Sequence, residues 1–211
     1  MKHAVLTGDL VASTTIRANY HEVLGEIATD VSQYVAPRSI FEVYRGDSFQ
    51  LLLSQPQEAL LVALLFRVGL RRYSNGTALD DAWDARVSIG LGSINANKPN
   101  ITTLGTLDGE AFVRSGRALD TMKNDAAFLR ITSGQGSIDE SLQVCTSLAD
   151  ALIGRWTTAQ CQAIYLHLLR GLTQKEIGEL LHVSQRAIGL RFESAQFHSL
   201  QPFLKYFKKI N

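Results

Sequence analysis

The stretch that decides the fold is FEVYRGDSFQLLL, at residues 41–53. Two runs rich in apolar, β-branched and aromatic residues flank RGDS at residues 45–48, which is the pattern of two strands joined by a tight turn. Gly46 can take the positive φ that such a turn needs. We therefore expect a β-hairpin with strands at residues 40–44 and 49–53.

Strands and helices alternate on both sides of this hairpin. Apolar residues spaced three and four apart predict helices at residues 16–34, 56–73 and 109–123, and short apolar runs predict strands at 3–7, 86–94 and 128–132. The order β-α-β-β-α-β-α-β predicts an α+β fold, a ferredoxin-like mixed sheet with helices on one face.

Two other segments complete this part of the chain. Glycine and serine in RVSIGLGSI, residues 86–94, indicate that another segment approaches this strand closely. Residues 95–108 are polar and predict an irregular, mobile loop. Apolar spacing predicts a further helix at residues 138–152.

Composition excludes several classes of protein. Of 211 residues, 45% are hydrophobic and 19% charged, which suits a packed core and excludes general disorder. Two cysteines form neither a disulfide framework nor a zinc site. The longest apolar run, residues 59–66, is too short to span a bilayer, and the N-terminus has no signal-peptide pattern. We therefore expect a cytoplasmic protein with no membrane partner.

Charge divides the chain into two parts. From residue 151 onward there are eight basic and three acidic residues, against thirteen basic and seventeen acidic residues before it. We expect a boundary near residue 153, with one domain at 1–153 and another at 154–211. The basic end suggests nucleic-acid binding, although a solvated basic face explains the charge equally well.

Helix-start signals occur three times after residue 156. Thr157 with Gln160, and Thr173 with Glu176, form capping boxes, and Ser184 is a third N-cap. Each predicts a helix, and the last two helices are separated by a short turn. Two short helices joined in this way are a helix-turn-helix.

The segment LTQKEIGELLHVSQRAIGLRFESA, residues 172–195, resembles bacterial helix-turn-helix domains of the sigma-factor region four and LuxR type. The resemblance implies double-stranded DNA as a partner, with the third helix in the major groove. A helical protein-interaction module is the alternative. The expected DNA contacts are Gln185, Arg186 and Gly189 at base edges, Ser184 near the backbone, and Lys175 and Arg191 at phosphates.

Two aspartates follow or precede strands of the predicted sheet. Asp9 comes directly after the first strand, and Asp47 lies in the hairpin turn. Carboxylates at the same end of neighbouring strands can hold Mg²⁺ or Mn²⁺. Alternatively, each aspartate bonds only its own backbone. Small polar residues at the start of the following helix would favour a phosphate there; these are Ser13, Thr14 and Thr15.

Four segments in order resemble class III nucleotidyl cyclase domains: AVLTGDLVAST at residues 4–14, FEVYRGDSFQLLL, RVSIGLGSI and DGEAFVRSGRALD at residues 108–120. They resemble more closely the SatD family, bacterial proteins that combine such a domain with a C-terminal helix-turn-helix. The resemblance implies Asp9 and Asp47 as metal ligands, assisted by the backbone carbonyl of Leu10, and Arg117 as the residue that stabilises the transition state.

The sequence departs from the cyclase pattern at two places. Val113 stands where those enzymes carry an asparagine, and Glu42, Val43 and Tyr44 stand where they carry a purine-recognising lysine. Losing such a charge-stabilising donor typically costs about 2.7–4 kcal/mol. Arg114 is an equal candidate for binding an anion.

These observations predict a homodimeric, DNA-binding transcription regulator whose degenerate cyclase-like domain senses a nucleotide or a related anionic ligand. The alternative is a metal-dependent nucleotidyl cyclase or transferase, with Arg117 as its catalytic residue and the C-terminal helices as its regulator. A weaker third reading is an interaction module without either chemistry.

Overall fold

The computed structural model describes residues 2–11, 19–44, 46–73, 83–95 and 103–211. The predicted phosphate-binding residues Ser13, Thr14 and Thr15 lie outside these ranges, as does the predicted start of the first helix. Among the described residues, no helix is long and apolar enough to cross a bilayer.

One mixed five-stranded sheet forms the centre of the molecule, in the order β2-β3-β1-β4-β5. Strand β1 (His3–Leu10) pairs antiparallel with β3 (Ser48–Leu53) and with β4 (Ala85–Gly92), while β2 (Ile40–Tyr44) pairs antiparallel with β3. Strand β5 (Leu129–Thr132) pairs parallel with β4. The α+β class and the mixed sheet are therefore confirmed.

The hairpin forms where the sequence predicts it. Tyr44 and Ser48 are partners at its closed end, and Gly46 has a φ of 80°. A residue with a side chain rarely adopts this left-handed conformation, so glycine is what allows the turn.

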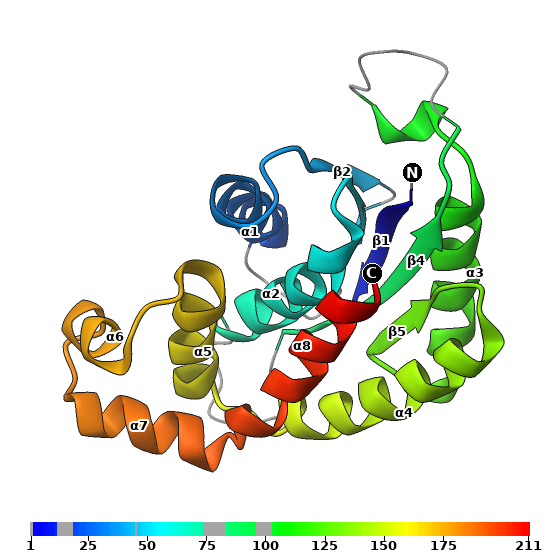
Figure 1. Cartoon of the computed structure of the whole chain (residues 1–211). Coiled ribbons are helices and arrows are strands. Elements are labelled where there is room, and N and C mark those ends of the chain that lie inside the picture. The colour runs from blue at the N-terminus through cyan, green and yellow to red at the C-terminus, as the bar shows by residue number, and fades with distance from the viewer. Residues whose placement is uncertain (1, 12–18, 45, 74–82, 96–102) are drawn as a thin grey trace.

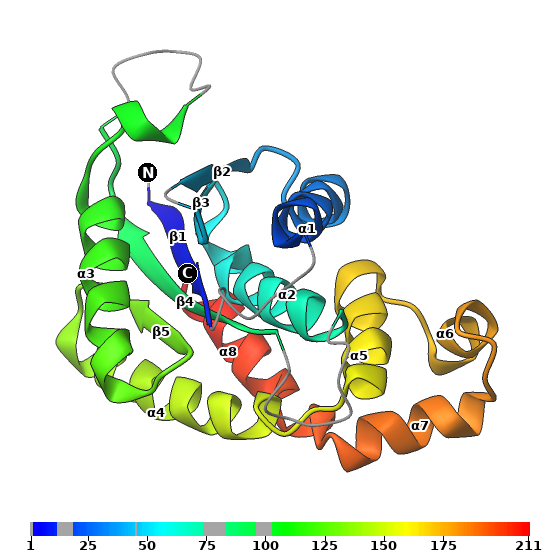
Figure 2. The same cartoon turned by 180° about the vertical axis from the view of Figure 1, so that it is seen from behind.

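Helices cover both faces of the sheet (Figures 1 and 2). Helices α1 (Tyr20–Tyr34) and α2 (Ala59–Arg71, preceded by the short 3₁₀ helix η2, Pro56–Glu58) pack on the face that carries Leu6. Helix α3 (Glu110–Asp125) packs on the opposite face, where Ala111 meets Val5. Our expectation of helices on one face is wrong, because β1 buries side chains of both alternating sets.

Helix α3 lies unusually close to β4, as the glycines and serine of that strand predicted. A Cβ built on Gly90 would lie 2.1 Å from the carbonyl oxygen of Ala111. Buried hydroxyls join α3 to the sheet, since Ser88 Oγ of β4 donates to the carbonyl of Ser115 at 2.7 Å and Thr7 Oγ1 of β1 donates to Ser115 Oγ at 2.9 Å.

The polar segment before α3 is only partly described. Its two ends, Asn95 and Asp108, pair in an isolated β-bridge, and a short 3₁₀ helix, η4, covers Leu104–Thr106. Residues 96–102, on which half of the predicted mobile loop falls, lie outside the described ranges.

The chain is helical from residue 136 onward. This part comprises α4 (Gly136–Ile153), α5 (Thr158–Arg170), α6 (Gln174–Leu180), α7 (Gln185–Ser194), the short 3₁₀ helix η5 (Phe197–Ser199) and α8 (Gln201–Ile210). The helices from 157, 173 and 184 are those that the caps predicted. Helix α8 was not predicted, although Pro202 at its start and the buried pair Phe203 and Phe207 are a helical signal.

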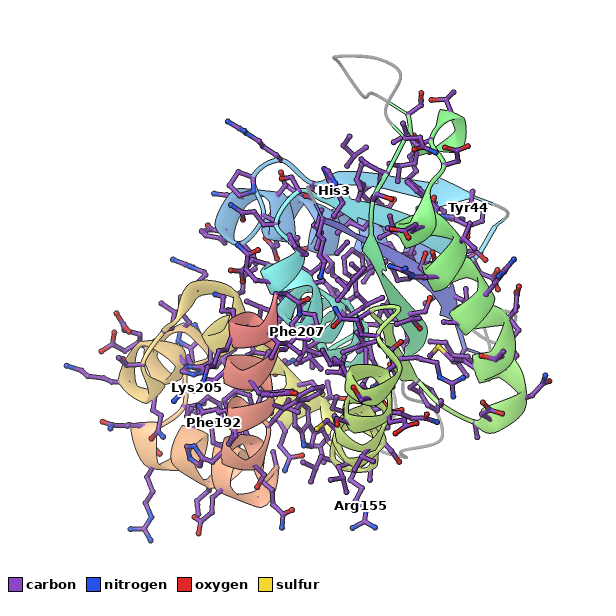
Figure 3. All side chains as sticks on the ribbon, turned by 45° about the vertical axis from the view of Figure 1, so that its right-hand side comes forward. His3, Tyr44, Arg155, Phe192, Lys205 and Phe207 are labelled. Atoms are coloured by element: carbon purple, nitrogen blue, oxygen red, sulfur yellow. The ribbon has the colours of Figure 1, made fainter. Side chains whose placement is uncertain are left out.

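The C-terminal helices share one continuous apolar core with the helices that cover the sheet. Helix α5 packs on α2, where a Cβ on Gly69 would lie 2.9 Å from Tyr165 Cε2. Helix α8 crosses back over α2 and buries Phe207 completely (Figure 3). The division into 1–153 and 154–211 stays a prediction.

A buried ionic network holds α2 to the segment that leads into α5. The side chain of Arg67 is 1% exposed and donates to both oxygens of Asp84 and, at 2.5 Å, to Asp150 on α4. Arg71 donates to Asp84 at 3.1 Å and to the carbonyls of Gly154 and Trp156, each at 3.1 Å. The sequence signal that we missed is two arginines four residues apart in an otherwise apolar helix.

Candidate functional site

Helices α6 and α7 meet at a tight turn. His182 has a φ of 54°, and the N–H of Val183 donates to the carbonyl of Gly178 at 2.9 Å. A Cβ on Gly178 would lie 2.7 Å from the carbonyl oxygen of Val183, so the turn folds tightly against α6. Histidine replaces the glycine common in such turns and still adopts the left-handed conformation.

The three predicted N-caps are confirmed. The backbone N–H groups of Gln160, Glu176 and Ala187 donate to the hydroxyls of Thr157, Thr173 and Ser184, at 3.3, 3.3 and 3.2 Å respectively. The first two complete capping boxes. The carboxylate of Glu176 accepts hydrogen bonds from the hydroxyl and from the backbone N–H of Thr173. These two bonds, the hydroxyl's first, stabilise the charged form and lower the pKa of Glu176 below its ordinary value.

Helix α7 has one buried and one exposed side. Ile188 and Phe192 are buried, and the ring of Phe192 packs at 5.4 Å from the rings of both Phe197 and His167. Gln185 and Arg186, in the first turn, are exposed. The aromatic cluster therefore fixes α7 so that its first turn faces solvent.

The other predicted DNA contacts differ in their surroundings. Lys175 is exposed, whereas the hydroxyl of Ser184 is used as a cap. Gly189 is half-buried, and a Cβ there would lie 3.1 Å from Gln174 Oε1. Arg191 is half-buried and donates to the carbonyl of Ala159 at 3.3 Å, which ties its guanidinium to α5.

Sequence reasoning missed one side chain on this surface. Leu190 is 55% exposed and follows Arg186 by one helical turn. The signal was its spacing, because residues four apart share one helical face. An apolar side chain there can contact a thymine methyl group.

The two aspartates do lie at the same end of neighbouring strands. Asp9 of β1 is in register with Ser48 of β3, and the N–H of Leu10 donates to the carbonyl of Asp47 at 3.2 Å. The hairpin places Asp47 directly before β3, so β1 and the turn meet at one edge of the sheet.

Cationic side chains contact the carboxylate of Asp9. The residue is 9% exposed, and its Oδ2 lies 3.4 Å from Lys123 Nζ and 4.0 Å from Arg86 Nη1. Ser48 Oγ donates to Oδ1 at 3.3 Å. Two positive charges therefore already balance this carboxylate.

A divalent ion takes six or more oxygen ligands, and a neighbouring ammonium group repels it. In the part of the chain that is described, no group of three or more His, Cys, Asp or Glu residues could hold a metal. With Lys123 and Arg86 against it, the carboxylate of Asp9 does not fit Mg²⁺ or Mn²⁺ as it is arranged.

The two candidate arginines of α3 are in different situations. Arg114 donates to the carbonyl of Leu91 and, at 3.2 Å, to Glu110, so its guanidinium is engaged within the protein. Arg117 is exposed, as is Val113, and no described ion pair or hydrogen bond joins Arg117 to Asp9. The described contacts thus do not assemble Arg117 and Asp9 into one site.

No protein-family model matches this chain, and no curated protein sequence does. Several solved structures are similar, and two of them are cyclases. A bacterial light-regulated adenylyl cyclase matches 63% of this chain and 76% of its own, with 14% identity and a TM-score of 0.43. The adenylate/guanylate cyclase/hydrolase from Silicibacter pomeroyi matches 57% of this chain and 69% of its own, with 17% identity and a TM-score of 0.38.

Both of these proteins are named as nucleotide cyclases, the class that the N-terminal motifs resemble. Likeness at this level carries no argument about function.

Proposed function

We propose that this chain is a DNA-binding transcription regulator that inserts α7 into the major groove. The observation that carries the proposal is the α6–α7 pair, whose tight turn leaves Gln185 and Arg186 exposed in the first turn of α7. In a helix-turn-helix, these N-terminal positions of the second helix contact base edges. Arginine can pair with guanine through two hydrogen bonds, and glutamine with adenine.

Charge supports the same proposal. Basic residues outnumber acidic residues eight to three after residue 150, and Lys175 is exposed in the first turn of α6. Contacts between basic side chains and phosphates supply much of the affinity of such proteins and make it depend on salt. Arg191 belongs to the framework in this proposal, because it is bonded to α5.

The proposal includes a homodimer, because helix-turn-helix proteins commonly read two half-sites one helical turn apart. The part of the chain that contains the sheet would then regulate DNA binding. A nucleotide or a related anion remains the ligand class proposed for them, with the exposed guanidinium of Arg117 as a described group available to it.

The enzyme alternative is less well supported. It needs the carboxylate of Asp9 as a metal ligand, whereas Lys123 and Arg86 lie against that carboxylate. The regulator is therefore the function that these contacts favour.

Fluorescence anisotropy with labelled genomic fragments at moderate salt tests the proposal. Replacing Arg186 by Ala should weaken binding to the preferred fragment by about tenfold or more and relax its sequence preference. Arg155→Ala is the matched control, since Arg155 is exposed outside α6 and α7 (Figure 3). Absence of any preferred fragment, or equal binding by the two variants, would count against the proposal.

A further inference from the structure

A cavity of about 350 Å³ lies between η2 and the start of α2, α5, η5 and α8. It is formed by residues that are far apart in the chain. Its lining includes Glu58 and Leu60 near the start of α2, His167 on α5, Phe197 on η5, and Leu204 and Lys205 on α8. Its size is within the range of small-molecule sites in proteins, which commonly lie between structural units.

The walls are largely apolar. Leu60 and Phe197 are almost completely buried, and Leu168 and Leu204 add further aliphatic surface. The rings of Phe197 and His167 are perpendicular, with centroids 5.5 Å apart. A ligand with a compact apolar or aromatic body would bury its surface against these side chains.

The rim is cationic. Lys205 is exposed, and no described hydrogen bond or ion pair engages its ammonium group, whereas Lys208 Nζ pairs with Glu58 Oε1 at 2.8 Å. Excess positive charge beside an apolar cavity is complementary to a ligand with one negative group. Lys205 is the side chain placed to receive it (Figure 3).

We propose that this cavity binds a small monocarboxylate with an apolar body, whose carboxylate pairs with Lys205. The walls fit the body, and the unpaired ammonium group at the rim fits the charge. Aromatic and aliphatic acids share this chemistry, so the test includes one of each.

The cavity also contacts the framework that holds α7. Phe197 and His167, which line it, are the two rings that pack against Phe192 of α7. A bound carboxylate would also compete with Glu58 for Lys208 and so weaken the link between α8 and η2. Binding of the acid stands independently of the proposed DNA function, whereas an effect on DNA affinity rests on it.

Isothermal titration calorimetry on the full chain without DNA tests the site. The ligands are indole-3-acetate and octanoate, each compared with its uncharged primary amide. We expect at least one acid to bind one per chain, and its amide to bind about tenfold more weakly, because the amide cannot form the charge-assisted bond. If only one acid binds, the result shows whether the cavity selects an aromatic or an aliphatic group.

Lys205→Gln should weaken binding of that acid by about tenfold. Lys209→Gln, an exposed lysine of α8 outside the cavity lining, should change it by less than about twofold. Both replacements are on the surface, and circular dichroism confirms that each variant is folded.

The site is wrong if neither acid binds, if the amide binds as well as its acid, or if the two lysine variants bind equally. Anisotropy with DNA, with and without the acid, reads the coupling separately. If DNA affinity is unchanged while the acid is bound, the proposed effect of the acid on DNA binding is wrong, but the binding site itself is not contradicted. Failure of DNA binding alone leaves the calorimetric result unaffected.

Discussion

The guanidinium of Arg67 donates to both oxygens of Asp84, at 3.0 and 2.9 Å, and both side chains are buried. This pair joins α2 to the residue before β4. Asp150 and Arg71 extend it to α4 and to the segment before α5. The C-terminal helices are thus held to the sheet by charge as well as by apolar packing.

Asp84→Ala should destabilise the protein by about 3–5 kcal/mol, because it leaves Arg71 buried without its carboxylate and leaves Arg67 with Asp150 alone. Urea unfolding followed by circular dichroism measures the change. Arg130→Ala is the control, since Arg130 pairs with the half-exposed Asp125 and its loss should cost about 1 kcal/mol or less. A loss of stability in Asp84→Ala as small as that in Arg130→Ala would contradict a stabilising role for the buried pair.

Gly90→Ala should destabilise the protein by about 1–3 kcal/mol or more, because its Cβ would lie 2.1 Å from the carbonyl oxygen of Ala111 and push α3 away from the sheet. Gly25→Ala, on α1, has open space around the new Cβ and should stabilise by about 0.5–1 kcal/mol. Thermal and chemical unfolding measure both. A neutral or stabilising effect of Gly90→Ala would contradict the close packing of α3.

The two cysteines should differ in reactivity. Burial raises the pKa of the Cys161 thiol to about 12, so it is almost wholly protonated at neutral pH, and the residue is inaccessible. Cys145 is half-buried. Mass spectrometry after iodoacetamide treatment should show Cys145 modified first and Cys161 modified only after unfolding. Prompt labelling of Cys161 in the native protein would contradict the packing of α5.

The cap of α6 should weaken at low pH. The folded state lowers the pKa of Glu176, so folding favours its carboxylate form. The stabilisation is present above the ordinary pKa of the group and is lost as pH falls through the lowered value. The difference in free energy of unfolding between the native chain and Glu176→Ala should therefore be present at pH 7 and shrink in acid. Glu179→Ala, on the same helix without a cap role, should show no such trend.

The arrangement at Asp9 predicts weak metal binding. Because Lys123 and Arg86 contact this carboxylate, millimolar Mg²⁺ or Mn²⁺ should give no saturable rise in melting temperature. Nucleoside triphosphates with either ion should give no cyclic product. A saturable rise that disappears in Asp9→Asn, or a product that does so, would favour the enzyme instead.

The features that could be predicted from the sequence are those that depend on short-range rules of turn geometry, helix capping and glycine placement. The hairpin at Gly46, the three N-caps and the close approach to Gly90 all depend on residues near one another in the chain, or on the absence of a side chain. Turn geometry and helix capping are short-range, so their residues carry the signal. The basic C-terminal part and the exposure of Gln185 and Arg186 follow from the same local pattern.

The sequence by itself determined the order of strands and helices and where most of them begin and end. The tertiary structure decided that α3 covers the second face of the sheet, that Lys123 neutralises Asp9, and that α8 returns over α2 to form a cavity. These contacts join residues that are far apart in the chain. Their formation depends on how the sheet buries apolar area on both faces, which no local pattern specifies.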